Sequence, residues 1–380
     1  MSDDKQLDEI ASLNTLDQLR KAIDQVDGKI HNLLNYRARL AERVAEVKLA
    51  ELKAETGEAD LSKVMFYRPE REAQVLQKVI DRNTGPLPDK TVAHLFREIM
   101  SACLALEKPM EVAYLGPEGT FTQAAAMKHF GHGVIAMPQP EIANVFAQVE
   151  SGQCNYGVVP VENSTEGMVN HTLDNFIDSP LKICGEVALR IELHLLVCEG
   201  ASAQTVKTIC AHRQALAQCR QWLDNNWPGV ERLAVSSNAE AARMAKDDPT
   251  IAAVAGDIAA EKYGLMKLAS SIEDLANNTT RFLIIGREDV PAGGNDKTSL
   301  IISAHNKPGA LLHLLTPFEQ AGISLTRIDT RPSRTQNWAY LFFVEFEGHQ
   351  QEPRVKAVLD NLIEQSVMLK VLGSYPAAVL

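Results

Sequence analysis

The chain has 380 residues, more than one hydrophobic core usually organises, so we expect three domains. Its formal net charge of -11 argues against nonspecific binding to nucleic acid or anionic membranes, so an anionic small substrate needs a local cluster of cations. An acidic N-terminus, no segment of membrane-spanning apolar length and six cysteines without a C-x-x-C pair lead us to expect a cytoplasmic protein with reduced thiols.

The first part of the chain predicts helices. From Leu16 to about Leu52 there is no proline and one glycine, and apolar residues recur at helical spacing, which predicts a helix of roughly 35 residues, about 55 Å long. So long a helix extends beyond any core that a segment of about 100 residues can build around it, so we expect a coiled or intertwined partner chain. Two shorter helices are expected from Glu70 to about Asp81 and from Lys90 to about Glu107.

After Pro109, short runs rich in β-branched residues alternate with helical stretches, which is an α/β pattern. PAGGND then reads as a linker, and the order strand, helix, strand, strand, helix, strand that follows is that of a ferredoxin-like fold. We therefore divide the chain into an all-α domain over 1–109, an α/β domain over 110–289, a linker over 290–296 and an α+β domain over 297–380.

Four cations make the helical domain a candidate anion site: Arg20, Arg37 and Lys48 on the long helix and Arg71 at the start of the next. At about 100° per residue, the eleven-residue step from Arg37 to Lys48 brings both to nearly one face of the helix. Arg20 is turned about 100° away from Arg37 and suits a site on a partner chain. On the pattern alone, a solvated charged face is the alternative explanation.

Four elements of the helical domain form a recognisable pattern: Leu19-Arg20 with Ile23 and Asp27, Leu33-Leu34-x-x-Arg37-x-x-Leu40-Ala41, Val47-Lys48, and Tyr67-Arg68-Pro69-Glu70-Arg71-Glu72. Over about residues 12–107 the pattern resembles the all-helical chorismate mutases. The resemblance implies an intertwined dimer in which Arg20 reaches the partner's site. Arg20, Arg37 and Arg71 would bind the carboxylates of chorismate. Lys48 would bind the ether oxygen, where negative charge develops, and Glu72 a substrate hydroxyl.

Three positions differ from the best-known pattern of these mutases. Arg68 stands where a hydroxyl-binding aspartate is usual and Cys103 where a serine is usual, and both are expected to contact the substrate. Glu107 replaces the glutamine that donates to the ether oxygen. Because a carboxylate would repel the developing charge, we expect Glu107 to be protonated, with a pKa raised by burial.

The α/β domain has two polar segments at the ends of predicted strands. Leu115-Gly116-Pro117-Glu118-Gly119-Thr120-Phe121 leads from a strand into a helix, so it suits close approach of an anion, although an ordinary turn explains it equally well. Its spacing is not that of a G-x-G-x-x-G dinucleotide loop. Val159-Pro160-Val161-Glu162-Asn163-Ser164-Thr165-Glu166-Gly167 places a carboxylate, an amide and two hydroxyls where open α/β sheets hold their ligands.

Together with His212 to Cys219, Ser236-Ser237-Asn238-Ala239 and Thr279-Thr280-Arg281-Phe282, these segments resemble prephenate dehydratase over about residues 111–287. The resemblance implies two lobes, like those of periplasmic binding proteins, around a cleft in which prephenate loses carbon dioxide and hydroxide together. It assigns the essential hydroxyl to Thr280, while Arg281 suits a carboxylate clamp and Glu162 or a hydroxyl network the proton donor. The other residues expected to bind or orient the substrate are Asn163, Ser164, Gln218, Ser237 and Asn238.

The C-terminal domain has a turn, Asn306-Lys307-Pro308-Gly309-Ala310-Leu311-Leu312, and a strand end, Thr326-Arg327-Ile328-Asp329-Thr330-Arg331-Pro332. Taken singly, these are a glycine turn and a capped strand. Together they resemble the phenylalanine site of the ACT domain, with Asp-Thr-Arg-Pro in place of Glu-Ser-Arg-Pro. The effector-binding residues that the resemblance implies are Asn306, Gly309, Ala310, Leu311, Leu312, Asp329, Thr330, Arg331 and Pro332.

These resemblances imply conversion of chorismate to prephenate and of prephenate to phenylpyruvate, with feedback inhibition by L-phenylalanine. The expected assembly is a homodimer or homotetramer, with no metal or redox cofactor and no nucleic acid or membrane partner. Two alternatives remain open. One is a mutase joined to an oxidative dehydrogenase, which requires a nucleotide loop that the sequence lacks; the other is a two-lobed sensor over 110–380 that has lost catalysis.

Overall fold

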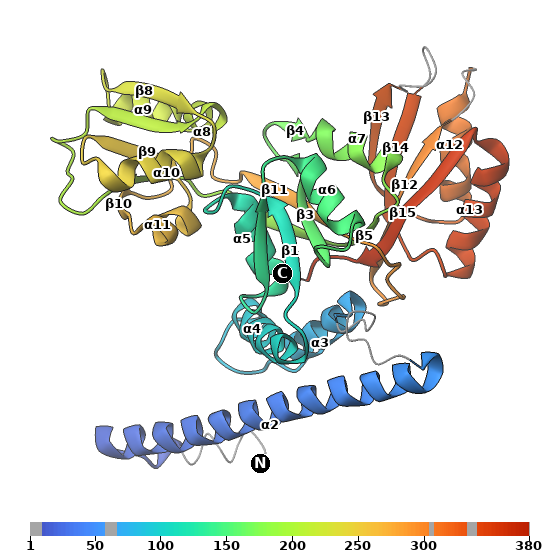
Figure 1. Cartoon of the computed structure of the whole chain (residues 1–380), viewed down its shortest axis with the longest axis horizontal. Helices are drawn as coiled ribbons and strands as arrows, with labels where there is room; N and C mark the ends of the chain where they lie inside the picture. The colour runs from blue at the N-terminus through green and yellow to red at the C-terminus, as the bar shows by residue number, and fades with distance from the viewer. Residues whose placement is uncertain (1–9, 58–66, 304–307, 333–339, 380) are drawn as a thin grey trace. The chain divides into compact units, whose positions relative to one another are not determined.

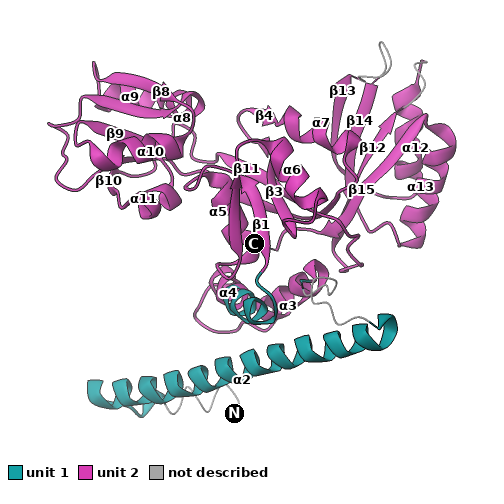
Figure 2. Cartoon of the chain, viewed as in Figure 1, with its two compact units in different colours: residues 1–67, 98–109 teal, residues 68–97, 110–380 magenta. Residues whose placement is uncertain are grey.

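The computed structural model (Figure 1) describes residues 10–57, 67–303, 308–332 and 340–379. The chain forms two compact units, one of residues 1–67 and 98–109 and the other of residues 68–97 and 110–380 (Figure 2). Within the described ranges, no helix combines the length and the apolar character needed to cross a bilayer. All six cysteines are unpaired thiols.

The first unit consists mainly of the long helix α2 (Leu16–Thr56). A capping box begins the helix: the side chain of Thr15 accepts from the backbone of Gln18, and the side chain of Gln18 accepts in return. Gly57 ends it in the left-handed conformation, with φ 77°. The predicted helix is therefore confirmed and continues to Thr56. None of its residues, all of which are described, is buried within a single chain.

The two shorter helices are α3 (Pro69–Asp81) and α4 (Asp89–Glu107), close to the predicted ranges. α3 begins at a proline. Backbone N–H groups in the first turn of a helix have no partner within the helix, so proline, which lacks an N–H, loses no hydrogen bond there. The two units divide α4: the second unit contains α3 and α4 as far as Arg97, and the first unit contains the rest of α4.

The α/β region of the second unit forms two lobes, each around one sheet. The elements of the first lobe are β1 (Glu111–Leu115), α5 (Phe121–Phe130), β2 (Ile135–Gln139), α6 (Ile142–Glu150), β3 (Tyr156–Asn163), β4 (Gly167–Met168), α7 (Asn170–Asp178), β5 (Lys182–Arg190) and β11 (Thr279–Gly286). Its strand order is β2-β1-β3-β11-β5, and β4 pairs with β3. β1 and β3 are parallel, so their carboxyl ends meet at one edge of the sheet.

The second lobe has the strand order β10-β6-β9-β7-β8. Its elements are β6 (His194–Val197), β7 (Thr208–His212), α8 (Arg213–Gln218), α9 (Arg220–Asn226), β8 (Glu231–Val235), α10 (Asn238–Asp247), β9 (Ile251–Ala255), α11 (Asp257–Tyr263) and β10 (Met266–Ala269). Two strongly apolar clusters, largely of alanine, leucine, isoleucine and valine, cover the two faces of this sheet. The lobe therefore has a core of its own.

The chain passes between the lobes twice, after β5 and before β11, and the two passages are hydrogen-bonded to each other. The N–H of Ile272 donates to the carbonyl of Leu193 at 2.8 Å, and the N–H of Ile191 donates to the carbonyl of Asn278 at 2.8 Å. On its return, β11 is inserted between β3 and β5, antiparallel to both. This insertion places the Thr-Arg-Phe element beside the end of β3.

The C-terminal module is an α+β sandwich of one sheet and two helices. Its elements are β12 (Asp296–Ser303), α12 (Ala310–Gln320), β13 (Leu325–Pro332), β14 (Tyr340–Glu347), α13 (Pro353–Gln365) and β15 (Met368–Pro376). The strand order β13-β14-β12-β15, with every pair antiparallel, is the ferredoxin-like arrangement and confirms the predicted fold.

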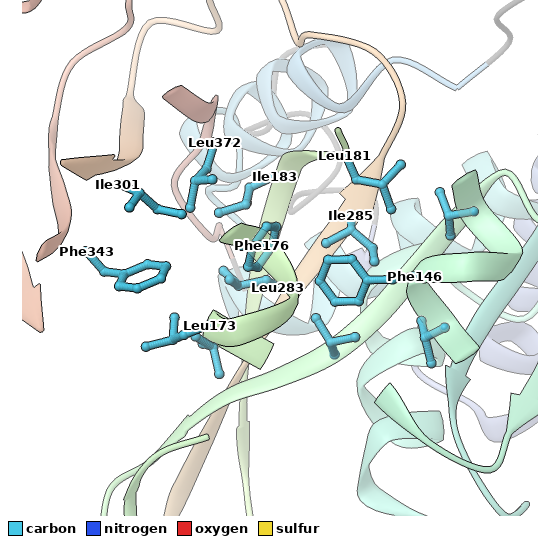
Figure 3. Close-up of a cluster of buried hydrophobic side chains, with 14 of the residues drawn as sticks. Phe146, Leu173, Phe176, Leu181, Ile183, Leu283, Ile285, Ile301, Phe343 and Leu372 are labelled. Carbon is cyan, nitrogen blue, oxygen red and sulfur yellow. The ribbon is translucent and has the colours of Figure 1, made fainter. Parts of the chain in front are cut away.

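The C-terminal sheet packs on the first lobe through one continuous apolar core, shown in Figure 3. Phe343 and Leu372 of the C-terminal module lie in the same cluster as Phe176, Ile183 and Leu283 of the first lobe. Burial of such side chains stabilises a fold by roughly 1.5–3 kcal/mol each. The two modules therefore share a core, and the packing of its side chains fixes how they are placed within the second unit.

The closest approach in this shared core is at Gly373, which has φ 150°. A Cβ there would lie 2.4 Å from the carbonyl oxygen of Ile183, a backbone atom that has no freedom to turn aside. We expect Gly373→Ala to lower the free energy of unfolding by at least about 1–3 kcal/mol, measured by urea denaturation. Gly85→Ala is the matched control, because the nearest atom to its Cβ is 3.9 Å away. A Gly373→Ala protein as stable as wild type would contradict the close contact.

Candidate functional site

The polar residues at the end of β3 face those at the start of β11. In the register of this antiparallel pair, Asn163 is opposite Thr280 and Glu162 is opposite Arg281. Because side chains alternate between the two faces of a sheet, the pair Asn163 and Thr280 lies on one face and the pair Glu162 and Arg281 on the other. The four residues expected to line one cleft are thus separated into two groups.

Asn163 is the centre of the first group. Its Nδ2 donates to Thr280 Oγ1 at 2.8 Å and to Asn278 Oδ1 at 2.9 Å. Its Oδ1 accepts from the backbone N–H groups of Thr165 and Glu166, at 3.0 and 3.2 Å. A backbone N–H can only donate, so these contacts fix which end of the amide is oxygen. Thr280 therefore accepts from Asn163, and its own hydroxyl proton is available to a further acceptor.

Asn278 also belongs to this group, although it is not among the residues expected from the sequence. It is 2 % exposed, its Oδ1 receives the second proton of Asn163, and its Nδ2 is buried without a hydrogen-bond partner among the described residues. The signal in the sequence was its place two residues before Thr280, at the end of the second passage between the lobes. Asparagine is so common in turns that the position alone did not distinguish it from a turn residue.

Ser164 and Gln218 occupy positions around this group. Ser164 Oγ accepts from the N–H of Thr279 at 3.0 Å, so its hydroxyl joins the ends of β3 and β11. Gln218, in the second lobe, donates from Nε2 to Thr165 Oγ1 at 3.4 Å, which links the two lobes. Thr165 also donates from Oγ1 to Asn163 Oδ1 at 2.6 Å, so the link reaches the central amide.

The two residues expected from the Ser-Ser-Asn-Ala element have structural contacts in the second lobe. Ser237 is the N-cap of α10, where its Oγ accepts from the N–H of Glu240 at 3.0 Å. Asn238 Oδ1 accepts from the N–H of His212 at 2.8 Å, which joins the starts of α8 and α10. The cap leaves the Ser237 hydroxyl proton available to a ligand, whereas the Asn238 oxygen is already used.

The second lobe also contacts the Gly-Pro-Glu-Gly turn that precedes α5. The hydroxyl of Tyr263 donates to the carbonyl of Glu118 at 3.2 Å, and Lys262 forms an ion pair with the Glu118 carboxylate. A Cβ on Gly119 would lie 3.5 Å from Cβ of Ala239, so the N-termini of α5 and α10 are close together. Both helix ends therefore stand at the edge where β1 and β3 end.

The second group, Glu162 and Arg281, faces the C-terminal module. The Glu162 carboxylate forms an ion pair with Arg327 of β13. Arg281 Nε donates to Glu186 Oε2 at 2.7 Å, and its Nη2 forms an ion pair with Glu345 of β14. The expected grouping of Glu162 and Arg281 with Thr280 is therefore corrected, because strand alternation turns both side chains away from it.

The residues expected in a chorismate site are divided between the two units. In the first unit, burial raises the pKa of Glu107, while the nearby charges of Lys48 and Arg37 act in the opposite direction. Arg37 and Lys48 are thus both near Glu107. Their eleven-residue spacing on the helix predicted that these two cations lie on nearly one face. Arg20 is exposed on α2, and Cys103 is buried.

The remaining members of that set lie in the second unit. Arg68 forms an ion pair with Glu70 at 2.7 Å, and Arg71 is exposed. Glu72 forms a partly buried ion pair with Arg97 at 3.0 Å. Arg97 donates from Nε to Oε1 of Glu72, so this carboxylate already accepts one hydrogen bond from within the chain.

The residues expected to bind an effector lie on two elements of the C-terminal module. Gly309 is the N-cap of α12 and has φ 78°. The first three residues of that helix are Ala310, Leu311 and Leu312. Asn306 lies outside the described residues. The other four are in β13: Asp329, Thr330, Arg331 and Pro332.

β13 is also fixed to the first lobe. Arg331 Nη2 donates to both carboxylate oxygens of Asp174, to Oδ1 at 2.8 Å and to Oδ2 at 2.9 Å. Burial raises the pKa of Asp329, while the charge of Arg327 acts against this. β13, called the effector strand because it carries four of the residues expected to bind an effector, therefore contacts the first lobe directly through Arg327 and Arg331.

Comparison with known proteins gives three family models in sequence order. Chorismate mutase type II matches residues 19–108, prephenate dehydratase residues 112–290 and the ACT domain residues 298–364. The bifunctional chorismate mutase/prephenate dehydratase of Pseudomonas aeruginosa is 56% identical over 371 residues, which cover 98% of this chain and 100% of that protein. The enzyme of the same name from Neisseria gonorrhoeae is 50% identical, over 96% of this chain and 99% of that protein.

A solved structure of prephenate dehydratase from Arthrobacter aurescens in complex with L-Phe matches with a TM-score of 0.65 at 33% identity. The match covers 70% of this chain and 90% of that one. The three family models and the nearly full-length likeness to two relatives agree with one another, and the chain belongs to the family of bifunctional chorismate mutase/prephenate dehydratases.

Proposed function

We propose that the chain catalyses two consecutive reactions, chorismate to prephenate and prephenate to phenylpyruvate, and that L-phenylalanine inhibits it. The observation that carries this proposal is the 56% identity, over 98% of the chain, to a relative whose name contains both activities. The test is purified protein supplied with chorismate alone. Phenylpyruvate should appear without a nicotinamide cofactor; accumulated prephenate would instead favour a chain whose second region only senses ligands.

The first reaction takes place among the cations of the helical domain, which we assign to residues 1–109. Arg20, Arg37 and Arg71 bind the two carboxylates of chorismate, and Lys48 donates to the ether oxygen as negative charge develops there. Protonated Glu107 is the second donor to that oxygen, which its raised pKa supports. Glu72 accepts from a substrate hydroxyl, and Arg68 and Cys103 complete the walls.

The helical domain acts as an intertwined dimer. None of the residues of α2 is buried within a single chain, although apolar side chains such as Ile23, Ile30 and Leu33 recur along it. An amphipathic helix that exposes its apolar stripe requires a partner surface to remove that stripe from water. A second copy supplies one, and its Arg20 then enters the neighbouring site.

Mutase activity should depend on pH through Glu107. The protonated carboxyl donates to the ether oxygen, so activity is present below the raised pKa and is lost as the pH rises through it. We expect kcat/KM for chorismate to fall on the alkaline side in wild type and to stay level in Glu107→Gln, which donates at every pH. Identical, flat profiles for the two proteins would contradict the assignment.

The second reaction takes place in the cleft between the two lobes of residues 110–289. Loss of carbon dioxide leaves an electron pair that moves into the ring and expels hydroxide, which a hydrogen-bond donor must stabilise. Thr280 is that donor, because Asn163 occupies its oxygen and leaves its proton for the substrate. Asn163, Gln218 and Ser237 orient the substrate, and the N-termini of α5 and α10 attract its carboxylates.

Removal of the Thr280 hydroxyl should strongly slow the second reaction. We expect Thr280→Ala to lower dehydratase kcat by about 100-fold or more, the usual effect of losing a positioned donor. Thr280→Ser, which keeps the hydroxyl, should retain part of the activity. Mutase activity measured on the same samples is the internal control and should be unchanged. A Thr280→Ala protein with full dehydratase activity would show that the donor lies elsewhere.

Asn278 should contribute by holding Asn163 in place. In Asn278→Ala, the amide of Asn163 loses one of its two acceptors and is less firmly directed at Thr280. We expect dehydratase kcat to fall about 10-fold with little change in KM, because the donor is misplaced rather than the binding surface removed. The matched control is Asn277→Ala, whose side chain is exposed and forms no hydrogen bond within the described residues. Equal kcat values for the two variants would contradict the role of Asn278.

Phenylalanine binds to the C-terminal module, which we assign to residues 297–380 after a linker over 290–296. The ACT model matches most of this region, and a related dehydratase was solved with L-Phe bound. The left-handed Gly309 at the start of α12 and the polar residues of β13 supply the site. The assembly is a homodimer or homotetramer in the cytoplasm, as the unpaired thiols support.

A further inference from the structure

Arg281 is held in a closed network of four charges at the junction of the first lobe and the C-terminal module. Its guanidinium binds Glu186 of β5, with Nε to Oε2 at 2.7 Å, and forms an ion pair with Glu345 of β14. Lys297 of β12 binds the other oxygens of the same two carboxylates, Glu186 at 2.8 Å and Glu345 at 3.4 Å. Two cations and two anions therefore balance in a region that is mostly shielded from water.

The network is buried and its hydrogen bonds are satisfied. The side chains of Glu186 and Glu345 are 6% and 8% exposed, and that of Arg281 is 15% exposed. Tyr375 donates to Glu345 Oε2 at 3.0 Å, in a position that no solvent reaches. Burial alone raises the pKa of Glu345, but Arg281 and Lys297 outweigh it and lower the pKa to about 2. The Glu345 carboxylate is thus charged at neutral pH.

Glu345 connects this network to the effector strand. Its Oε1 accepts from Thr326 Oγ1 of β13 at 2.7 Å, three residues before Asp329. A continuous chain of polar contacts therefore runs from Thr326 through Glu345 to Arg281. Arg281 directly follows Thr280 in β11, so the chain ends one peptide unit from the hydroxyl assigned to catalysis.

We propose that Arg281 is a positioning residue, through which Glu345 of the C-terminal module holds Thr280 at the angle that catalysis requires. This inference rests on the proposed function of Thr280. Adjacent residues of a strand share one peptide plane, so anchoring the Arg281 side chain on one face restrains the direction of Thr280 on the other. A displacement of about 1 Å at a catalytic group can cost about 100-fold in rate.

The same link carries the effect of phenylalanine. A ligand bound beside β13 that shifts this strand also shifts Thr326 and Glu345, and the shift reaches Thr280 through Arg281. Coupling between two sites requires a structural element whose position is affected by ligands at both sites. Here that element is β14 with the Glu345 carboxylate. The coupling is reciprocal, so a substrate that orders Thr280 also biases the effector strand.

The decisive variant is Glu345→Gln, which keeps the size of the side chain and removes its charge. We expect dehydratase kcat to fall about 10-fold with KM changed less than about twofold, and the phenylalanine concentration for half-inhibition to rise about 10-fold. Phenylalanine binding measured directly by calorimetry should change less than about twofold. Mutase kcat should equal that of wild type. Asp224→Asn, which removes the charge from an ion pair with Arg232 in the second lobe, is the matched control and should change none of these values.

Other outcomes separate the explanations. Unchanged dehydratase kcat and inhibition in Glu345→Gln would overturn the proposal, as would loss of phenylalanine binding in proportion to loss of inhibition. If Glu345→Gln does not fold, Arg281→Lys decides by the same readouts, because lysine keeps the charge but lacks the planar guanidinium whose Nε and Nη2 bind Glu186 and Glu345. A wild-type protein that produces no phenylpyruvate would defeat the proposed function itself, whatever the variants do.

Discussion

Neighbouring side chains in a β-strand point to opposite faces, and this alternation in the β3–β11 pair is the constraint on which the proposed dehydratase site depends. One face carries Asn163 and Thr280, whose hydrogen bond leaves the Thr280 hydroxyl proton available to a further acceptor. The other face carries Glu162 and Arg281, whose charges are bound by the C-terminal module. Thr280, the proposed donor, and Arg281, the proposed anchor, are thus adjacent in sequence but lie on opposite faces of the sheet.

The proposed anchoring role gives a physical reason for the buried charges at this junction. Transfer of charged groups out of water is costly, and removal of one partner from a buried pair typically costs about 3–5 kcal/mol. A purely apolar contact would hold the modules together as well, as the shared core around Phe343 and Phe176 does. What the ion pairs add is direction: a guanidinium between two carboxylates fixes an angle, whereas apolar packing fixes mainly a distance. The helical domain also combines burial with nearby charges: Arg37 and Lys48 lie near Glu107, whose pKa is raised by burial.

The sequence predicted those features that depend on local periodicity. The long helix, the alternating α/β region and the ferredoxin-like order all follow from spacing within a few residues, and the structure confirms them. The raised pKa of Glu107 was also predictable. In a chorismate mutase site, an ionised carboxylate at this position would repel the negative charge that develops on the ether oxygen. The register of β3 against β11 was not, because it joins residues more than 100 positions apart, and a shift of one residue would have exchanged the faces. Arg281 was therefore expected in the cleft, and Asn278 was not selected at all.

Arg281 distinguishes the two views of the site most directly, because a carboxylate clamp and an anchor require its side chain on opposite faces of β11. The decisive measurement is a crystal structure of the chain with prephenate, or a stable dicarboxylate analogue of it, bound in the cleft. We expect Thr280 Oγ1 within hydrogen-bond distance of the leaving oxygen and the Arg281 guanidinium still bound to Glu186 and Glu345. An Arg281 side chain turned into the cleft and bound to a substrate carboxylate would contradict it.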